Sequence, residues 1–128
     1  MRVGFDIHGT IDKDDKLLDF VKLISTMDAF QVFIISGPPL RQIVEEVKLL
    51  GIQPYKVQII SVVDWLRDKG TLMWKDENGW WCEPEIWWES KSLICYEYSI
   101  DIIFDDKIEY AKHMSNETKF ILWKGENR

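Results

Sequence analysis

Short runs of consecutive apolar residues recur along the chain, and between them apolar residues return every three or four positions. The runs are typical of strands buried on both faces of a sheet, and the intervening pattern is typical of helices with one buried face. We therefore predict strands over 3–7, 31–35, 56–60, 100–104 and 119–123, alternating with helices near 17–24, 40–51, 61–70, 90–98 and 108–113. This alternation predicts an α/β fold, a doubly wound, Rossmann-like sheet of five parallel strands in the order 3-2-1-4-5.

The segment from about 71 to 88 interrupts this alternation. Its Asn78-Gly79 pair is the strongest short-range signal for a β-hairpin. The same segment is crowded with tryptophans, namely Trp74, Trp80, Trp81, Trp87 and Trp88. We predict a small Trp-rich β-hairpin inserted into a single domain that spans residues 1–128.

The composition is that of a globular chain and narrows the choice of partners. Hydrophobic residues make up 46% of the sequence, yet no apolar run approaches the roughly 20 residues that span a bilayer. The 2 cysteines form no Cys-x-x-Cys pair, and the first strand follows the N-terminus with no room for a signal peptide. We therefore expect a cytoplasmic protein that does not enter a membrane. The net charge of −6 argues against nucleic acid as a partner.

Polar residues stand where three of the predicted strands end. Asp6 closes the first strand, Ser36-Gly37 follows the second, and Asp105-Asp106 follows the fourth. Ligands of parallel α/β sheets bind beyond the carboxyl ends of the strands, so these side chains should lie near one another. Two adjacent carboxylates at a buried strand end repel each other unless a cation lies between them. The pattern therefore indicates a site for a divalent cation and an anion.

Each of these signals also has an ordinary structural explanation. Asp6 could simply precede a turn, Ser36 could begin a helix, and Asp105-Asp106 could be solvated. Lys91, early in the helix before the fourth strand, could neutralise a phosphate or lie on a solvated helix face. Their joint order and spacing are more specific than any one of them.

That order and spacing resemble the haloacid dehalogenase superfamily of phosphohydrolases, over nearly the whole chain. The first family motif, Asp-x-Asp-Gly-Thr, resembles Val-Gly-Phe-Asp6-Ile-His8-Gly9-Thr10, and the second, an apolar strand ending in Ser or Thr, resembles Val-Phe-Ile-Ile-Ser36-Gly37. Lys91 fits the third motif. The fourth, an apolar strand ending in two acids, resembles Ile-Asp-Ile-Ile-Phe-Asp105-Asp106. The insertion near 71–88 is too short for a full cap domain, which implies a capless or minimal-cap member.

The resemblance implies a Mg²⁺-dependent phosphatase in which Asp6 attacks phosphorus and forms an aspartyl-phosphate. Ser36, Gly37 and Lys91 would hold the phosphoryl oxygens. The Mg²⁺ ligands would be Asp6, Asp106 and the backbone carbonyl of His8, with Asp105 supporting them from behind. The substrate would be a small phosphate ester, a nucleotide among the options.

His8 departs from the family motif, which has a second Asp at this position. In the family that Asp protonates the leaving group and then activates water. A histidine has a free pKa near working pH and could do this work. Alternatively it marks a site that has lost catalysis, or its imidazole binds the metal. If the imidazole is neutral, we expect a preference for phosphates with good leaving groups.

The tryptophans of the predicted hairpin have two interpretations. Trp74, Trp80 and Trp81 could form a substrate flap whose indoles stack on an aromatic part of the substrate. They could instead fill a small secondary core or form a surface for self-association or for a protein partner. The alternative to a phosphatase is accordingly a catalytically weakened binding module that contacts a protein through the hairpin, and a homodimer is also conceivable.

Overall fold

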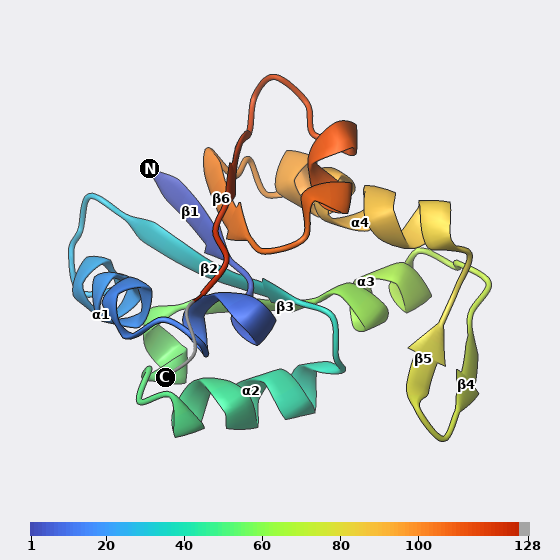
Figure 1. Cartoon of the computed structure of the whole chain (residues 1–128), viewed down its shortest axis with the longest axis horizontal. Helices are drawn as coiled ribbons and strands as arrows, with labels where there is room; N and C mark the ends of the chain where they lie inside the picture. Colours follow the sequence, from blue (N-terminus) through green and yellow to red (C-terminus); the bar gives the residue numbers. More distant parts are fainter. Residues whose placement is uncertain (126–128) are drawn as a thin grey trace.

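The computed structural model describes residues 1–125 and has an α/β architecture, in which helices cover both faces of a five-stranded parallel sheet (Figure 1). A separate two-stranded antiparallel hairpin projects from one end. The sheet strands are β1 (Arg2–Phe5), β2 (Gln31–Ser36), β3 (Gln58–Ser61), β6 (Ile102–Asp105) and β7 (Lys119–Leu122), and the hairpin strands are β4 (Trp74–Asp76) and β5 (Gly79–Trp81).

The strand order in the sheet is β3-β2-β1-β6-β7, and every neighbouring pair is parallel. The sequence-based order 3-2-1-4-5 counted sheet strands alone, whereas β4 and β5 of the structure belong to the hairpin, so the numbering of the last two strands differs. The first strand thus lies at the centre, between β2 and β6. Its carboxyl end faces the point where the order of the strands reverses, which is where ligands of such sheets bind.

Local sequence explains where the helices begin. Asp14 caps α1 (Asp15–Ile24), because its side chain accepts hydrogen bonds from the backbone N–H groups of Lys16 and Leu17. Ser61 caps α3 (Val62–Asp68) in the same way, by accepting from the N–H of Asp64. The remaining α-helices are α2 (Leu40–Leu49) and α4 (Pro84–Glu97). Within residues 1–125 no helix is long and apolar enough to cross a membrane.

Two hydrophobic cores, one on each face of the sheet, hold the layers together. Buried side chains of α1 and α2 pack with Val3, Phe5 and Ile34 on one face. On the other face, buried side chains of α3 and α4 pack with Phe33, Ile35 and other strand residues. Neighbouring strand residues thus point to opposite cores, as expected of strands that read as uninterrupted apolar runs.

Several element boundaries predicted from the sequence are wrong, among them the end of β1, which lies at Phe5, and the start of β6, which lies at Ile102. Helix α4 begins at Pro84 instead of residue 90, because proline is well suited to the first helical turn, where its missing N–H would have no partner. Trp87 and Trp88 are therefore helical, and the hairpin ends at Trp81. A 3₁₀ turn, η2 (Pro54–Lys56), delays the start of β3 to Gln58. The helix predicted over 108–113 has the predicted bounds and is a 3₁₀ helix, η3 (Ile108–His113).

Candidate functional site

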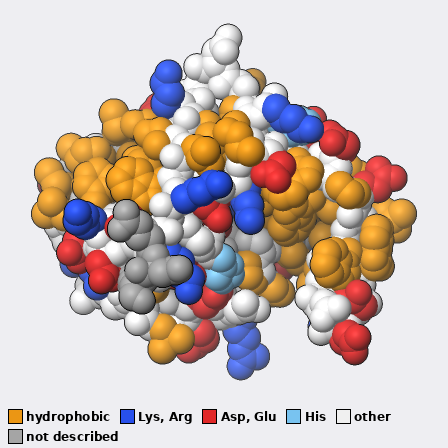
Figure 2. Space-filling view, viewed as in Figure 1, with side chains coloured by type: hydrophobic (Ala, Val, Ile, Leu, Met, Phe, Trp, Pro, Cys, Tyr) orange, Lys and Arg blue, Asp and Glu red, His pale blue; other side chains and the backbone are white. Residues whose placement is uncertain are grey.

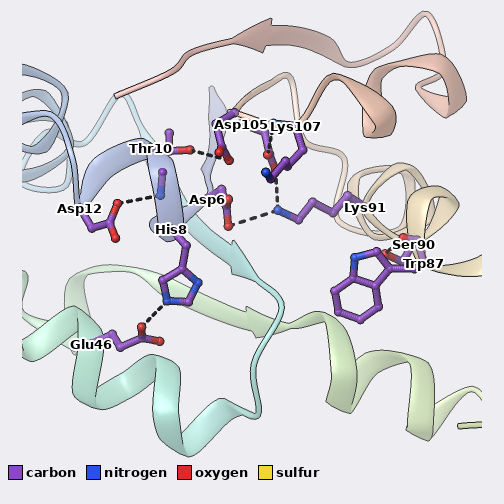
Figure 3. A network of polar contacts seen from close by, with 12 residues as sticks. Asp6, His8, Thr10, Asp12, Glu46, Trp87, Ser90, Lys91, Asp105 and Lys107 are labelled. Carbon is purple, nitrogen blue, oxygen red and sulfur yellow. Dashed lines mark hydrogen bonds and ion pairs between the residues drawn. The ribbon is translucent and has the colours of Figure 1, made fainter. Parts of the chain in front are cut away.

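The acids at the strand ends meet in the structure. Asp6 directly follows β1, and its backbone N–H donates to the carbonyl of Phe104 in β6 at 3.0 Å. Asp105 is the last residue of β6, and Asp106 follows it. Carboxylate oxygens of Asp6, Asp105 and Asp106 lie within 4.8 Å of one another, which is close enough to share one cation (Figure 3). The sequence-based expectation that these residues converge is thus met by the geometry.

Lys91 reaches the same cluster from α4. Its side chain is fully buried, and Nζ lies 2.5 Å from Oδ2 of Asp105 and 3.3 Å from Oδ1 of Asp6 (Figure 3). Burial alone would lower the pKa of Lys91, but the two carboxylates outweigh burial and hold the pKa above its usual value. Lys91 is therefore a fixed positive charge inside the site, and the solvated alternative for this residue is excluded.

Asp6 has a carboxyl group with an unusually high proton affinity. Its side chain is buried, and burial raises the pKa to about 6, although Lys91 acts in the opposite direction. The charge of Asp105 adds to the rise. A second cation beside Asp6 would favour its ionised form.

The segment after β1 forms a wide irregular turn, η1 (Ile7–Ile11), in which the backbone of His8 and Gly9 is not helical. Gly9 has a φ of +77°, and a methyl group on its Cα would come within 2.2 Å of Oδ2 of Asp106. The buried hydroxyl of Thr10 donates to Oδ1 of Asp106 at 3.4 Å. The Gly-Thr pair thus lets Asp106 approach Asp6 closely and helps to orient it.

Asp105 supports the site from behind. Its side chain is completely buried, Oδ2 pairs with Lys91, and Oδ1 accepts a hydrogen bond from the backbone N–H of Lys107 at 3.0 Å. Both oxygens therefore already have partners within the protein. The supporting role expected for Asp105 behind a metal ion stays a prediction.

Ser36 ends β2 at the same edge of the sheet. Its hydroxyl is completely buried and has no hydrogen-bond partner among the described residues. Buried hydroxyl groups without partners are uncommon in folded proteins and call for an explanation. Gly37 follows in the loop before α2, where a Cβ would lie 3.2 Å from the Trp87 ring. The two residues thus link the strand end to an aromatic side chain.

His8 lies apart from the cluster of acids. Its ring is about half exposed and points from η1 toward α2, where Nε2 makes a short contact with the carboxylate of Glu46 (Figure 3). The other oxygen of Glu46 is shielded from solvent and has no partner among residues 1–125. The side chain of His8 is thus held by Glu46, and its role as an acid or base stays a prediction.

Sequence reasoning missed Glu46 and Tyr110. Tyr110 is buried in η3, and its ring centroid lies 4.5 Å from Nζ of Lys91. Burial raises the pKa of Tyr110 to about 12, so its hydroxyl stays protonated. No sequence signal ties either residue to the site, because the contact of Glu46 with His8 and that of Tyr110 with Lys91 join different elements.

The predicted flap residues separate into two groups. Trp80 and Trp81 line a cavity of about 370 Å³ between the hairpin and the start of α4, whereas Trp74 does not line it. The lining residues are Trp80, Trp81, Cys82, Pro84, Trp87 and Trp88. Trp74 and Trp81 are 51% and 44% exposed, which is unusual for side chains of this size.

No family model matches the chain, and comparisons with curated proteins and with solved structures found no match either. The functional argument therefore rests on the residues and geometry of the chain itself.

Proposed function

We propose that the chain is a Mg²⁺-dependent phosphatase of the haloacid dehalogenase type, acting through an aspartyl-phosphate on Asp6. The observation that carries this proposal is the buried lysine among three acids at the strand-reversal point. A buried serine hydroxyl that has no partner within residues 1–125 ends β2 at the same edge of the sheet. A phosphoryl group requires cations around its oxygens and a nucleophile in line with the leaving group. Lys91 and Ser36 are suited to bind the phosphoryl oxygens, and Asp6 is suited to be the nucleophile.

The donor set fits Mg²⁺, a hard cation that prefers carboxylate and carbonyl oxygens. Asp6 and Asp106 would hold it, with the backbone carbonyl of His8 as a further ligand, because both oxygens of Asp105 already have partners. When bound, Mg²⁺ would neutralise charge on the phosphoryl oxygens and reduce their repulsion of the Asp6 carboxylate.

The chemical steps follow from the residues at the site. An oxygen of ionised Asp6 attacks phosphorus, the bond to the leaving oxygen breaks, and an aspartyl-phosphate forms. Lys91 and the Ser36 hydroxyl stabilise the charge on the transferred group. Water then attacks phosphorus, releasing inorganic phosphate and the free carboxylate. The leaving oxygen gains a proton and the attacking water loses one, and His8 is the residue expected to assist.

The decisive experiment measures inorganic phosphate release with Mg²⁺ over a panel of esters, anhydrides and nucleotides. Activity should be abolished by EDTA and by Asp6→Asn, a near-isosteric change that removes the nucleophile. Aryl or acyl phosphates and anhydrides should turn over faster than simple alkyl monophosphates. No release above the Asp6→Asn background, with every substrate tried, would contradict the proposal.

A second candidate function is a binding module that has lost most catalysis, and two observations favour it. The side chain of His8 turns toward Glu46, and Trp74 and Trp81 present large apolar surface to solvent. Exposed tryptophans of this kind suit a protein partner or a second copy of the chain.

Substitution of His8 separates the two functions. If histidine works as acid and base, His8→Ala should lower turnover by about 10²–10⁴-fold. If the site is nearly inert, His8→Asp should instead raise turnover sharply above that of the unaltered chain. The control for both His8 variants is Glu46→Gln, which removes the carboxylate charge beside His8 but keeps a side chain of the same size there.

A further inference from the structure

We propose that the tryptophan-lined cavity binds a planar aromatic ring of the substrate, so that the substrate is an aromatic phosphate. This inference rests on the proposed phosphatase function and specifies its substrate class. The cavity has a volume of about 370 Å³, within the range of small-molecule sites, and suits a ring system of modest size. Figure 2 shows hydrophobic side chains gathered over the hairpin, to one side of the charged groups at the centre of the view.

The first argument is the contact between a residue that lines the cavity and the loop that follows Ser36. Trp87 lines the cavity, and its Cζ2 and Cη2 atoms lie 3.2 and 3.3 Å from the position of a Cβ on Gly37. A side chain at residue 37 would therefore press on the indole. One wall of the cavity thus touches the loop that follows Ser36, so a ring in the cavity and a phosphate at that loop can belong to one small molecule.

The second argument is a separate connection through Lys91. Trp88, which also lines the cavity, packs edge-on against Tyr110 with ring centroids 4.9 Å apart. Tyr110 in turn lies under Nζ of Lys91, at 4.5 Å from the ring centroid. Two wall residues of the cavity, Trp87 and Trp88, thus connect it to the proposed phosphate site, through Gly37 and through Tyr110.

The third argument is the chemistry of the walls. Four of the six lining residues are tryptophans, whose flat faces stack on other flat rings. Trp80 also makes a cation–π contact with Arg67, whose guanidinium carbon lies 4.4 Å from the ring centroid. An aliphatic group could fill the same volume but would gain no stacking. The cavity therefore favours an aromatic ring over an alkyl group of equal size.

The test uses phenylphosphonate and cyclohexylphosphonate, which have similar size but differ in planarity. Neither has an ester bond, so binding is measured without hydrolysis or leaving-group effects. Calorimetry with Mg²⁺ should give an affinity at least about fivefold higher for phenylphosphonate, from the usual strength of ring stacking. Indole N–H signals in NMR spectra should shift for tryptophans of the cavity and stay in place for Trp74.

A matched pair of variants locates the effect. Trp74 and Trp81 face each other across the hairpin, both are exposed, and only Trp81 lines the cavity. Trp81→Leu should remove most of the preference for phenylphosphonate, and Trp74→Leu should leave it intact. Equal losses in the two variants, or equal affinities of the two phosphonates for the unaltered chain, would overturn the inference.

The outcomes separate this inference from the phosphatase proposal. Phosphate release from esters together with equal binding of both phosphonates would overturn the aromatic site alone. Preferred binding of phenylphosphonate without phosphate release from any ester would overturn hydrolysis alone. A second binding experiment uses the methylenephosphonate analogue of adenosine monophosphate. If it binds more tightly than phenylphosphonate, the ring is a nucleobase held beyond a sugar, and if more weakly, the ring is attached directly to the phosphate oxygen.

Discussion

Lys91 combines two properties that rarely occur together, a positive charge and complete burial. Removing such a charge leaves its carboxylate partners buried without a counter-ion, which typically costs about 3–5 kcal/mol. We predict that Lys91→Met lowers the free energy of unfolding by about this amount in EDTA, as measured by urea denaturation. Mg²⁺ should recover part of the loss, because it offers Asp6 and Asp106 another cation.

Lys69→Met is the control for that prediction. Lys69 pairs with Glu97 at 2.8 Å, but both side chains are substantially exposed, and solvent screens such pairs. Its loss should change stability far less than the loss of Lys91. Similar effects in the two variants would mean that burial of Lys91 is not what makes its charge important.

The carboxyl group of Asp6 predicts an unusual dependence of stability on pH. Its pKa in the folded chain is about 6, against a usual value of 3.8, so the folded state binds this proton more tightly than the unfolded state. Ionised Asp6 therefore destabilises the metal-free fold above about pH 6, by roughly 2–3 kcal/mol, and this cost disappears below about pH 4.

Asp6→Asn, which mimics the neutral acid, should accordingly be more stable than the unaltered chain at pH 7.5 in EDTA. The difference should shrink toward zero as the pH falls from 6 to 4. Urea denaturation at several pH values measures it. A variant less stable at pH 7.5 would show that the attraction of Lys91 for ionised Asp6 exceeds the cost of burial.

At the residue scale, the sequence predicts the acids of the site well and the contacts of their neighbours poorly. Asp6 and Asp105-Asp106 follow apolar runs, and the ends of parallel strands necessarily meet at one edge. The complete burial of Lys91 and the contact of His8 with Glu46 depend on how α4 and α2 pack on the sheet. Such packing between distant segments leaves no local pattern in the sequence.

At the scale of elements, the turn η1 is where backbone geometry would control the proposed metal binding. We predict that Gly9→Ala weakens Mg²⁺ binding by at least about tenfold, because the new methyl group would overlap Oδ2 of Asp106 and displace that ligand. The positive φ would add a backbone cost of about 1–2 kcal/mol. Calorimetric titration with Mg²⁺ measures the affinity.

Gly70→Ala provides a control with the same backbone penalty. Gly70 has a φ of +80°, yet a Cβ there would meet no atom within 4 Å. The two alanine variants should lose similar backbone stability, while only Gly9→Ala should lose Mg²⁺ affinity. Unchanged affinity in Gly9→Ala would remove Asp106 from the set of expected ligands.

The elements themselves follow closely from the apolar pattern, and their boundaries follow less well. Strands β1, β2 and β6 are buried on both faces and read as continuous apolar runs. The apolar pattern does not locate the start of α4, because the first two turns of this helix carry tryptophans that also suit the hairpin. Pro84, which is well suited to a first helical turn, is the local signal for that start. Tryptophan favours neither helix nor strand strongly enough to decide between the two.

For the whole molecule, the proposed function predicts stabilisation by a specific cation. Any ligand that binds the folded chain alone raises its stability, by about 2.7 kcal/mol at a concentration one hundred times Kd. MgCl₂ should therefore raise the melting temperature beyond the effect of NaCl at equal ionic strength, which matters because the chain carries a net charge of −6. Asp106→Asn should abolish the difference between the two salts. Equal shifts with MgCl₂ and NaCl would argue against a magnesium site.

The central position of β1 has a consequence for synthesis and folding. β1 is made shortly before β2, whereas β6, its neighbour on the other side, is made only after the hairpin and α4. Until β6 emerges from the ribosome, one edge of β1 remains unpaired, and open apolar edges of this kind promote aggregation. Nascent or truncated chains that lack β6 should thus depend most on chaperones, because the acids at the strand ends meet only once β6 has paired with β1.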